Sequence, residues 1–463
     1  MSVADLHLIA SSEFFDTLIE TLFLESYNTR LVVLGTAFLG ATAGIIGSFL
    51  LLRKQSLLGD ALSHATLPGI GIAFAVMVAL GGSGRNLPGL LLGATITGLL
   101  GVLLVLAIRR TTRLKDDAAM GIVLSVFFGL GVAILKMVQE IPGASAAGLD
   151  SFIYGKPASM IMSDLIIIGV TLLLTIVICL IILKELTLLC FDDSFASTQG
   201  YPTAFLDIIL MGLVTAVTVV GLQSVGLILI IALLITPPTA ARFWTNDLRK
   251  MLWLSAFIGG LSGWLGASFS AFFEDLPAGA IIVITAGIIF LISMIFGPTR
   301  GVLPRYLRQR QLKRKVGRQH ILRSVYEIME AEQESHPLKN LPISLERLRD
   351  HRVWSKGELP RLIRQARSED HLERQPSGEL RLSESGFGEA SRITRNHRLW
   401  ELYLIKHADI APSHVDRDAD MVEHILGAEM VHQLEAELEL QEHTLESPHV
   451  IENESIPSPK GAT

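Results

Sequence analysis

The chain of 463 residues contains nine apolar segments, each about as long as a membrane-spanning helix. The hydrocarbon core of a bilayer needs about 20 consecutive apolar residues in a helix. Helices satisfy their own backbone hydrogen bonds, so the pattern limits most of the chain to an all-α polytopic membrane fold. The nine predicted spans are 31–52, 60–80, 88–108, 118–138, 164–184, 203–222, 224–244, 250–272 and 278–297.

Charge is distributed unevenly along the chain. Only 18% of all residues are charged, whereas a soluble domain carries about 25%. Residues 31–297 are almost continuously apolar and residues 300–463 are rich in charge, which indicates a membrane domain followed by a soluble one. The two cysteines, Cys179 and Cys190, provide neither a disulfide framework nor a thiolate-rich zinc site.

Basic residues in the loops predict the orientation of the membrane domain. The loops after the odd-numbered spans are basic, beginning with Arg53 and Lys54, and a longer basic run follows the ninth span. Cytoplasmic loops are enriched in Lys and Arg, so we expect the N-terminus outside and the C-terminal domain in the cytoplasm. Residues 1–30 are amphipathic and are predicted to form an interfacial segment at the membrane lipid surface.

The second span begins with two ionisable residues inside an apolar run. Asp60 and His64 are four residues apart, so a helix places both on one face. Ionisable groups in a membrane need a partner, and a divalent cation bound by both groups would supply one. The alternative is structural, with Asp60 capping the helix and His64 in an interhelical hydrogen bond. Ser63 is either a second-shell donor to such a site or a small packing residue.

Two further stretches of the membrane domain depart from a simple span-and-loop pattern. Residues 191–200 predict a short amphiphilic helix that is ended by a glycine, and this helix either docks on a cytoplasmic partner or is an ordinary solvated loop. Pro237 and Pro238 predict a break or kink late in the seventh span.

These stretches together resemble the ABC-importer permeases that carry zinc, manganese or iron(II). The resemblance covers about residues 20–305 and rests on the stretches 56–69, 191–200, 225–229 with 232–237, and 296–301. It implies a homodimeric permease in the bacterial plasma (inner) membrane, a cytoplasmic ABC ATPase subunit and an extracytoplasmic metal-binding protein.

The same resemblance assigns roles to particular residues. It implies that Asp60 and His64 coordinate the ion in transit. It also implies that the loop 191–200 couples the permease to the ATPase, with coupling residues Asp192, Asp193, Ala196 and Gly200. No Gly-x-x-x-x-Gly-Lys-Ser/Thr motif occurs in the sequence, so we expect a non-catalytic subunit whose ATP is hydrolysed by a separate polypeptide. An oxygen and a nitrogen ligand suit manganese or iron(II) at least as well as zinc.

The charged part of the chain shows the pattern of a soluble helical domain. The predicted elements are an amphipathic helix at 321–329, short helices at 345–349 and 356–367, a hairpin at 372–382, and helices at 383–408 and 414–440. The first four of these elements, in that order, predict a winged helix-turn-helix.

This soluble part resembles the metal-dependent repressors of the iron and manganese regulator family. The matching stretches are 383–386, 395–404 and 420–424. The resemblance implies a cytoplasmic metal site formed by His397, Asp420, Glu423 and His424. One departure is that the acidic ligands of that family fall at His320 and Arg323 in this sequence, and an arginine repels a cation.

DNA or phosphate contact is an alternative role for the soluble part. The predicted helix 356–367 is basic, and phosphate contacts need basic side chains, here Lys356, Arg361, Arg364 and Arg367. A solvated helix face, an acidic membrane surface or the ATPase as partner would explain the same pattern.

The sequence thus predicts about nine transmembrane helices followed by a C-terminal cytoplasmic winged-helix plus helical dimerisation domain. The predicted domains are 1–30 (interfacial segment), 31–299 (permease), 300–318 (basic linker), 319–382 (winged helix), 383–440 (dimerisation and metal site) and 441–463 (disordered tail). The predicted function is the permease subunit of an ATP-driven importer of manganese, zinc or iron ions, with a metal-sensing regulatory domain. The alternative is a membrane-tethered, metal-responsive DNA-binding regulator.

Overall fold

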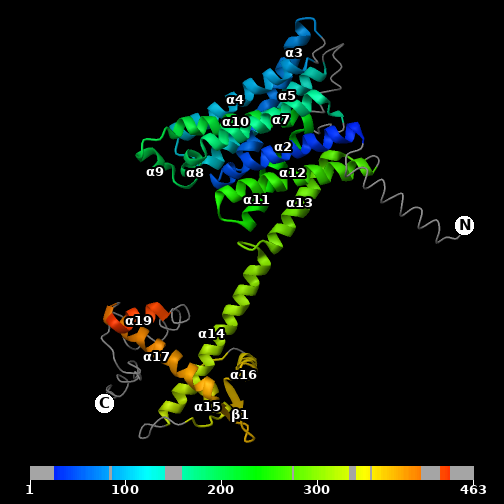
Figure 1. Cartoon of the computed structure of the whole chain (residues 1–463). Helices are drawn as coiled ribbons and strands as arrows, with labels where there is room; N and C mark the ends of the chain where they lie inside the picture. Colours follow the sequence, from blue (N-terminus) through cyan, green and yellow to red (C-terminus); the bar gives the residue numbers. More distant parts are fainter. Residues whose placement is uncertain are drawn as a thin grey trace, which may run out of the picture. The chain divides into compact units, whose positions relative to one another are not determined.

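The chain folds into two compact units, Met1–Arg305 and Tyr306–Thr463. A computed structural model describes residues 26–82, 86–140, 159–273, 276–332, 340–354, 357–407 and 428–437. Figure 1 shows the helices of both units.

Nine helices in the described part of the first unit are long and apolar enough to cross a membrane, which confirms the prediction. They are α2 (Tyr27–Leu52), α3 (Leu58–Ala79), α4 (Leu87–Thr111), α5 (Asp116–Gln139), α7 (Met162–Ile181), α10 (Thr203–Val225), α11 (Leu227–Trp244), α12 (Leu248–Phe272) and α13 (Ala278–Phe296). Two shorter helices, α8 (Leu183–Phe191) and α9 (Asp193–Thr198), connect α7 to α10.

The nine spans form two groups that meet along α10. In the first group α2 packs on α12, α11 and α7, and in the second α3 packs on α4 and α5 (Figure 1). Helix α10 contacts α2 and α11 of the first group and α3 and α4 of the second. The second group carries the Asp60–His64 face, so α10 connects that face to the rest of the bundle.

Glycines allow α2 and α12 to approach closely. A Cβ atom at Gly40 would lie 2.2 Å from the carbonyl oxygen of Gly259, and one at Gly259 would lie 2.1 Å from the carbonyl oxygen of Gly40. One turn away, the Ser255 hydroxyl donates a 2.7 Å hydrogen bond to the Gly44 carbonyl. Lipid gives no hydrophobic driving force between helices, so backbone contact and interhelical hydrogen bonds hold this pair together.

The sequence predicts a break or a kink at the double proline of the seventh span, and the structure shows no break. Helix α11 continues through Pro237 and Pro238, and both prolines are buried. The reason lies in the neighbouring helix, where Gly47 leaves room for the backbone around Leu234; a Cβ at Gly47 would lie 2.0 Å from the Leu234 carbonyl oxygen. Packing of this kind is how membrane helices tolerate proline.

The second unit contains the helices and the hairpin that the sequence predicts, in the predicted order. Its elements are α14 (Val302–Ala331, which begins in the first unit), α15 (Leu345–His351), α16 (Glu358–Ser368), β1 (Leu372–Arg374), β2 (Leu380–Leu382), α17 (Glu384–His407) and α19 (Ala428–Glu437). The strands are antiparallel, with Leu372 opposite Leu382, and Gly378 turns the chain at a φ of +92°. Buried side chains of α14, α15, α16 and the hairpin form one core.

The stretch predicted as a basic linker is largely helical. Helix α14 runs without interruption from Val302 to Ala331 and contains most of the stretch 300–318. Its Arg, Lys, Gln and Leu residues are good helix formers, and its one proline, Pro304, lies in the first turn, where proline is tolerated. The residues 414–427 and 438–440 of the last predicted helix lie outside the described residues.

We predict that Gly259→Ala destabilises the membrane unit by about 1–3 kcal/mol, because the added methyl group would meet the α2 backbone. The measurement is the thermal unfolding of the detergent-solubilised chain. Gly287→Ala is the matched control, since a Cβ at Gly287 in α13 meets nothing within 4 Å. Equal unfolding temperatures for the two variants would contradict the close crossing of α2 and α12.

Candidate functional site

A tight connection between α2 and α3 places Asp60 near the start of its helix. The Gln55 amide donates to the Leu50 carbonyl, and the Leu58 amide donates to the Gln55 carbonyl, so the chain reverses within a few residues. Asp60 is the third residue of α3. At about 1.5 Å of rise per residue, His64 lies roughly one helical turn further into the bundle. The pair therefore lies in the first third of α3.

Asp60 and His64 face each other on the surface of α3. His64 Nε2 lies 3.3 Å from Asp60 Oδ1, and the two side chains are 17% and 27% exposed, respectively. The other ring nitrogen of His64, Nδ1, is buried and has no hydrogen-bond partner among the described residues. The ring of Phe128 on α5 packs edge-on against the imidazole of His64, with the two ring centroids 4.8 Å apart. One carboxylate and one imidazole thus converge at a partly exposed position.

The contacts of Ser63 and the start of α3 bear on two other roles predicted for this region. The Ser63 hydroxyl donates a 2.7 Å hydrogen bond to the Gly59 carbonyl of its own helix, and Ser63 is fully buried. The N-cap position of α3 is Leu57, and no side chain caps it. Asp60 is therefore not the N-cap residue, although its charge is favourable in the first helical turn.

Four charged residues form a partly buried network near the connection from α2 to α3. Asp207 of α10 forms an ion pair with Arg53, which follows α2, and lies 3.6 Å from Arg109 of α4. Arg109 in turn lies 2.9 Å from Asp116 in the first turn of α5. This network was not predicted from the sequence, although an aspartate inside the apolar segment 203–222 is a sign of it.

The loop between α7 and α10 contains a short helix, as predicted, and its surface is aromatic. Asp192 caps α9 by accepting a 2.8 Å hydrogen bond from the Phe195 amide, and Gly200 ends the turn with a φ of +82°. Ala196 is fully buried, whereas Phe195 is 49% exposed and Asp193 is also exposed. Helix α9 therefore presents an acidic and aromatic face to its surroundings.

Only one of the four residues predicted for the cytoplasmic metal site can be placed. Asp420, Glu423 and His424 lie outside the described residues. His397 is on α17, where its side chain is 1% exposed and contacts Arg323 and Glu401. Over the described ranges no three His, Cys, Asp or Glu side chains converge on a common metal position.

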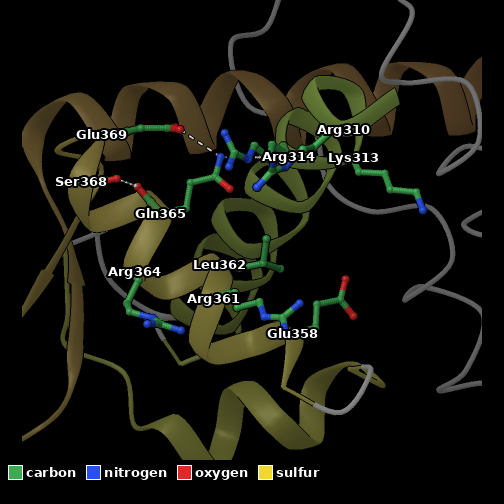
Figure 2. Close-up of a pocket in the computed structure, with 10 residues that line it drawn as sticks. All are labelled: Arg310, Lys313, Arg314, Glu358, Arg361, Leu362, Arg364, Gln365, Ser368 and Glu369. Carbon is green, nitrogen blue, oxygen red and sulfur yellow. Dashed lines mark hydrogen bonds between the residues drawn. The ribbon is translucent and has the colours of Figure 1, made fainter. Parts of the chain in front are cut away.

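A basic pocket lies between α14 and α16 (Figure 2). Its volume is about 890 Å³, and its lining residues are Arg310, Lys313, Arg314, Glu358, Arg361, Leu362, Arg364, Gln365, Ser368 and Glu369. Partial burial acts to raise the pKa of Glu369, but hydrogen bonds from Arg318 and Gln365 hold it below its usual value. Of the predicted phosphate contacts, Arg361 and Arg364 line the pocket, Arg367 is exposed outside it, and Lys356 lies outside the described residues.

Comparison with known proteins identifies the membrane unit. The profile of the ABC 3 transport family matches residues 26–297, which is more than half of the chain and includes all nine spans. The chain belongs to the ABC 3 transport family. A second profile, the metal binding and dimerisation domain of the iron dependent repressor, matches residues 383–452. Both resemblances expected from the sequence are therefore confirmed.

The names of individual relatives of this ABC 3 family chain mention two different metals, manganese and zinc. It is 36% identical over 395 residues to the manganese transport system membrane protein MntC of Bacillus subtilis, covering 85% of this chain and 88% of the relative. It is 45% identical over 289 residues to the zinc transport system membrane protein TroC of Treponema pallidum, covering 62% and 94%. Among solved structures, PsaBC from Streptococcus pneumoniae in complex with Fab is similar, with a TM-score of 0.53 and 32% identity over 65% of this chain and 99% of that one.

Proposed function

We propose that the chain is the permease subunit of an ATP-driven importer of divalent transition-metal ions. The observation that carries this proposal is the Asp60–His64 pair, because two ionisable side chains share a partly exposed position on a membrane-spanning helix. Ionisable groups at such positions are costly and mark ion pathways by default. The family match and the named metal transporters among the relatives support the same function.

The ion is proposed by class, as manganese, zinc or iron(II). A carboxylate oxygen and an imidazole nitrogen accept all three ions, and both manganese and zinc occur in the names of relatives. Two ligands per chain make a weak site, and a site in a pathway has to release its ion. The metal is thus the substrate of the proposed permease.

A second copy of the chain would complete this site. Asp60 and His64 are 27% and 17% exposed in the single chain, and Phe128 beside them is 45% exposed. If this face pointed at lipid, the two ionisable groups would lie against hydrocarbon with only each other as partners. Packing of two copies through the α3 and α5 faces would bring two carboxylates and two imidazoles together. The proposal is therefore a homodimeric pathway.

The remaining partners follow from the orientation expected from the basic loops. With the N-terminus outside, α9 and the second unit (Tyr306–Thr463, the soluble unit) are in the cytoplasm, where α9 would dock on a separate ABC ATPase. An extracytoplasmic metal-binding protein would deliver the ion to the opposite face. The soluble unit is proposed as a regulatory domain in a bacterial inner-membrane protein. A metal-sensing role for it would depend on His397 together with Asp420, Glu423 and His424.

We predict that Asp60→Asn and His64→Gln each lower metal uptake about tenfold or more, because each removes one of the two ligands that a chain supplies. The measurement is uptake of manganese, zinc and iron(II) into cells that also express the ATPase of the same transport system. Asp117→Asn is the matched control, since Asp117 is also in a first helical turn but is exposed on α5. Unchanged uptake of all three ions, at equal membrane levels of the variants, would refute the proposed pathway.

We predict that Phe195→Ala reduces co-purification of the ATPase several-fold, because an exposed aromatic side chain on α9 is a strong anchor for a partner. Phe269→Ala is the matched control, with a 48% exposed phenylalanine near the far end of α12 compared with 49% for Phe195. Equal recovery of the ATPase with both variants would exclude α9 as the docking helix.

The basic pocket of the soluble unit favours a second candidate function, binding of DNA by a membrane-tethered regulator. We predict for this function that Arg361→Ala with Arg364→Ala weakens binding of double-stranded DNA to the full chain. The slope of log K against log salt should also fall by about one per cation removed. Arg349→Ala on α15 is the control, because Arg349 is exposed outside the pocket. Absence of DNA binding at physiological salt would eliminate this candidate.

A further inference from the structure

A buried set of charged side chains joins α14 to α17 in the soluble unit. His397 and Glu401 are one turn apart on α17 and are 1% and 0% exposed, while Arg323 of α14 is 4% exposed. The Arg323 Nη1 atom lies 2.7 Å from His397 Nδ1, and His397 Nε2 lies 3.2 Å from Glu401 Oε1. Arg323 also lies 3.1 Å from the carboxylate of Glu327, four residues further along α14.

The chemistry of arginine determines the proton positions on His397. A guanidinium has only N–H donors, so His397 Nδ1 has to accept the hydrogen bond with its lone pair. The proton of the neutral ring is therefore on Nε2, which faces the Glu401 carboxylate. Each ring nitrogen of His397 thus has a charged neighbour of the complementary kind.

This arrangement has the form of a histidine metal site with a guanidinium at the metal position. Histidines that bind metals usually donate their second ring N–H to a carboxylate and direct the free lone pair at the cation. His397 directs that lone pair at Arg323 instead. A zinc ion on Nδ1 would need to lie about 2.0–2.1 Å from it along the same lone pair, which the guanidinium nitrogen at 2.7 Å obstructs.

The residues present therefore do not fit a metal bound through His397. The family profile that matches residues 383–452, which include His397, is that of a metal binding and dimerisation domain. A guanidinium on that histidine is therefore a departure of this chain from the expected chemistry. Arg323 already supplies a cation to the partly buried Glu327 carboxylate, and the fully buried Glu401 carboxylate accepts from His397 Nε2.

We propose that the Arg323 guanidinium replaces the metal ion on His397 and holds α14 to α17 whether or not cytoplasmic metal is present. A second contact between the same helices is consistent with a permanent connection, since Arg398 of α17 forms a two-pronged ion pair with Glu330 of α14. The proposal concerns the soluble unit alone and is independent of the ion pathway at Asp60 and His64.

The test is metal binding by the full chain, purified in detergent and stripped with a chelator. Equilibrium dialysis against manganese or zinc chloride gives the bound metal per chain for the wild type and for His397→Gln. A glutamine can accept from Arg323 and donate to Glu401 but is a poor metal ligand, so it preserves the packing. The proposal expects equal metal per chain in both proteins, and a loss of about one equivalent in His397→Gln would overturn it.

Hydrogen–deuterium exchange of peptides from 384–407 provides a local readout in the same full-length chain. The proposal expects no effect of manganese or zinc on this exchange in the wild type. In Arg323→Met, Glu327 loses its cation and His397 Nδ1 loses its donor, so the proposal expects exchange to become at least about tenfold faster. It expects partial recovery in Arg323→Lys. Slower exchange in the wild type on adding metal, abolished by His397→Gln, would show that metal displaces the arginine and would overturn the proposal.

Discussion

The Asp207 carboxylate imposes the main constraint on the membrane unit. An ionised group between helices is tolerated only with a partner of opposite charge, and Asp207 has two of them, Arg53 and Arg109. These pairs fix the ends of α2, α4 and α10 against one another. Asp116 extends the network to α5 and also accepts a hydrogen bond from Gln55, which lies in the turn before α3. The first turn of α3, which carries Asp60, is therefore attached to a frame of four helix ends.

Much of the membrane fold could be predicted from the sequence because hydrophobic length is a local property. Each span can be recognised from about 20 consecutive apolar residues. The four-residue spacing of Asp60 and His64 likewise places both on one helix face. The network around Asp207 could not be predicted in the same way, since Asp207 and Arg53 are 154 residues apart in sequence. The helix through Pro237 and Pro238 also depends on a distant residue, Gly47 of the neighbouring helix.

The soluble unit shows a different limit of prediction from sequence. A resemblance to metal-dependent repressors predicts which residue types occupy particular positions, and His397 is at the expected position on a helix. Its environment is set by Arg323, which is 74 residues away and sits where an acidic ligand was expected. The sequence alone showed the arginine as a departure, but it could not show that the guanidinium bonds the histidine itself. Similarly, the basic residues of 300–318 were visible, whereas their continuation into one helix with the core of the unit was not.

The connection between α10 and α11 consists of the single residue Gly226, with a φ of +87° and a ψ of 170°. Almost only glycine adopts this combination of angles, because a side chain would collide with the backbone. The sixth and seventh spans consequently have no loop between them that could accept an epitope tag, a glycan or a protease cut. The angle between these two helices is set by the two torsions of one residue.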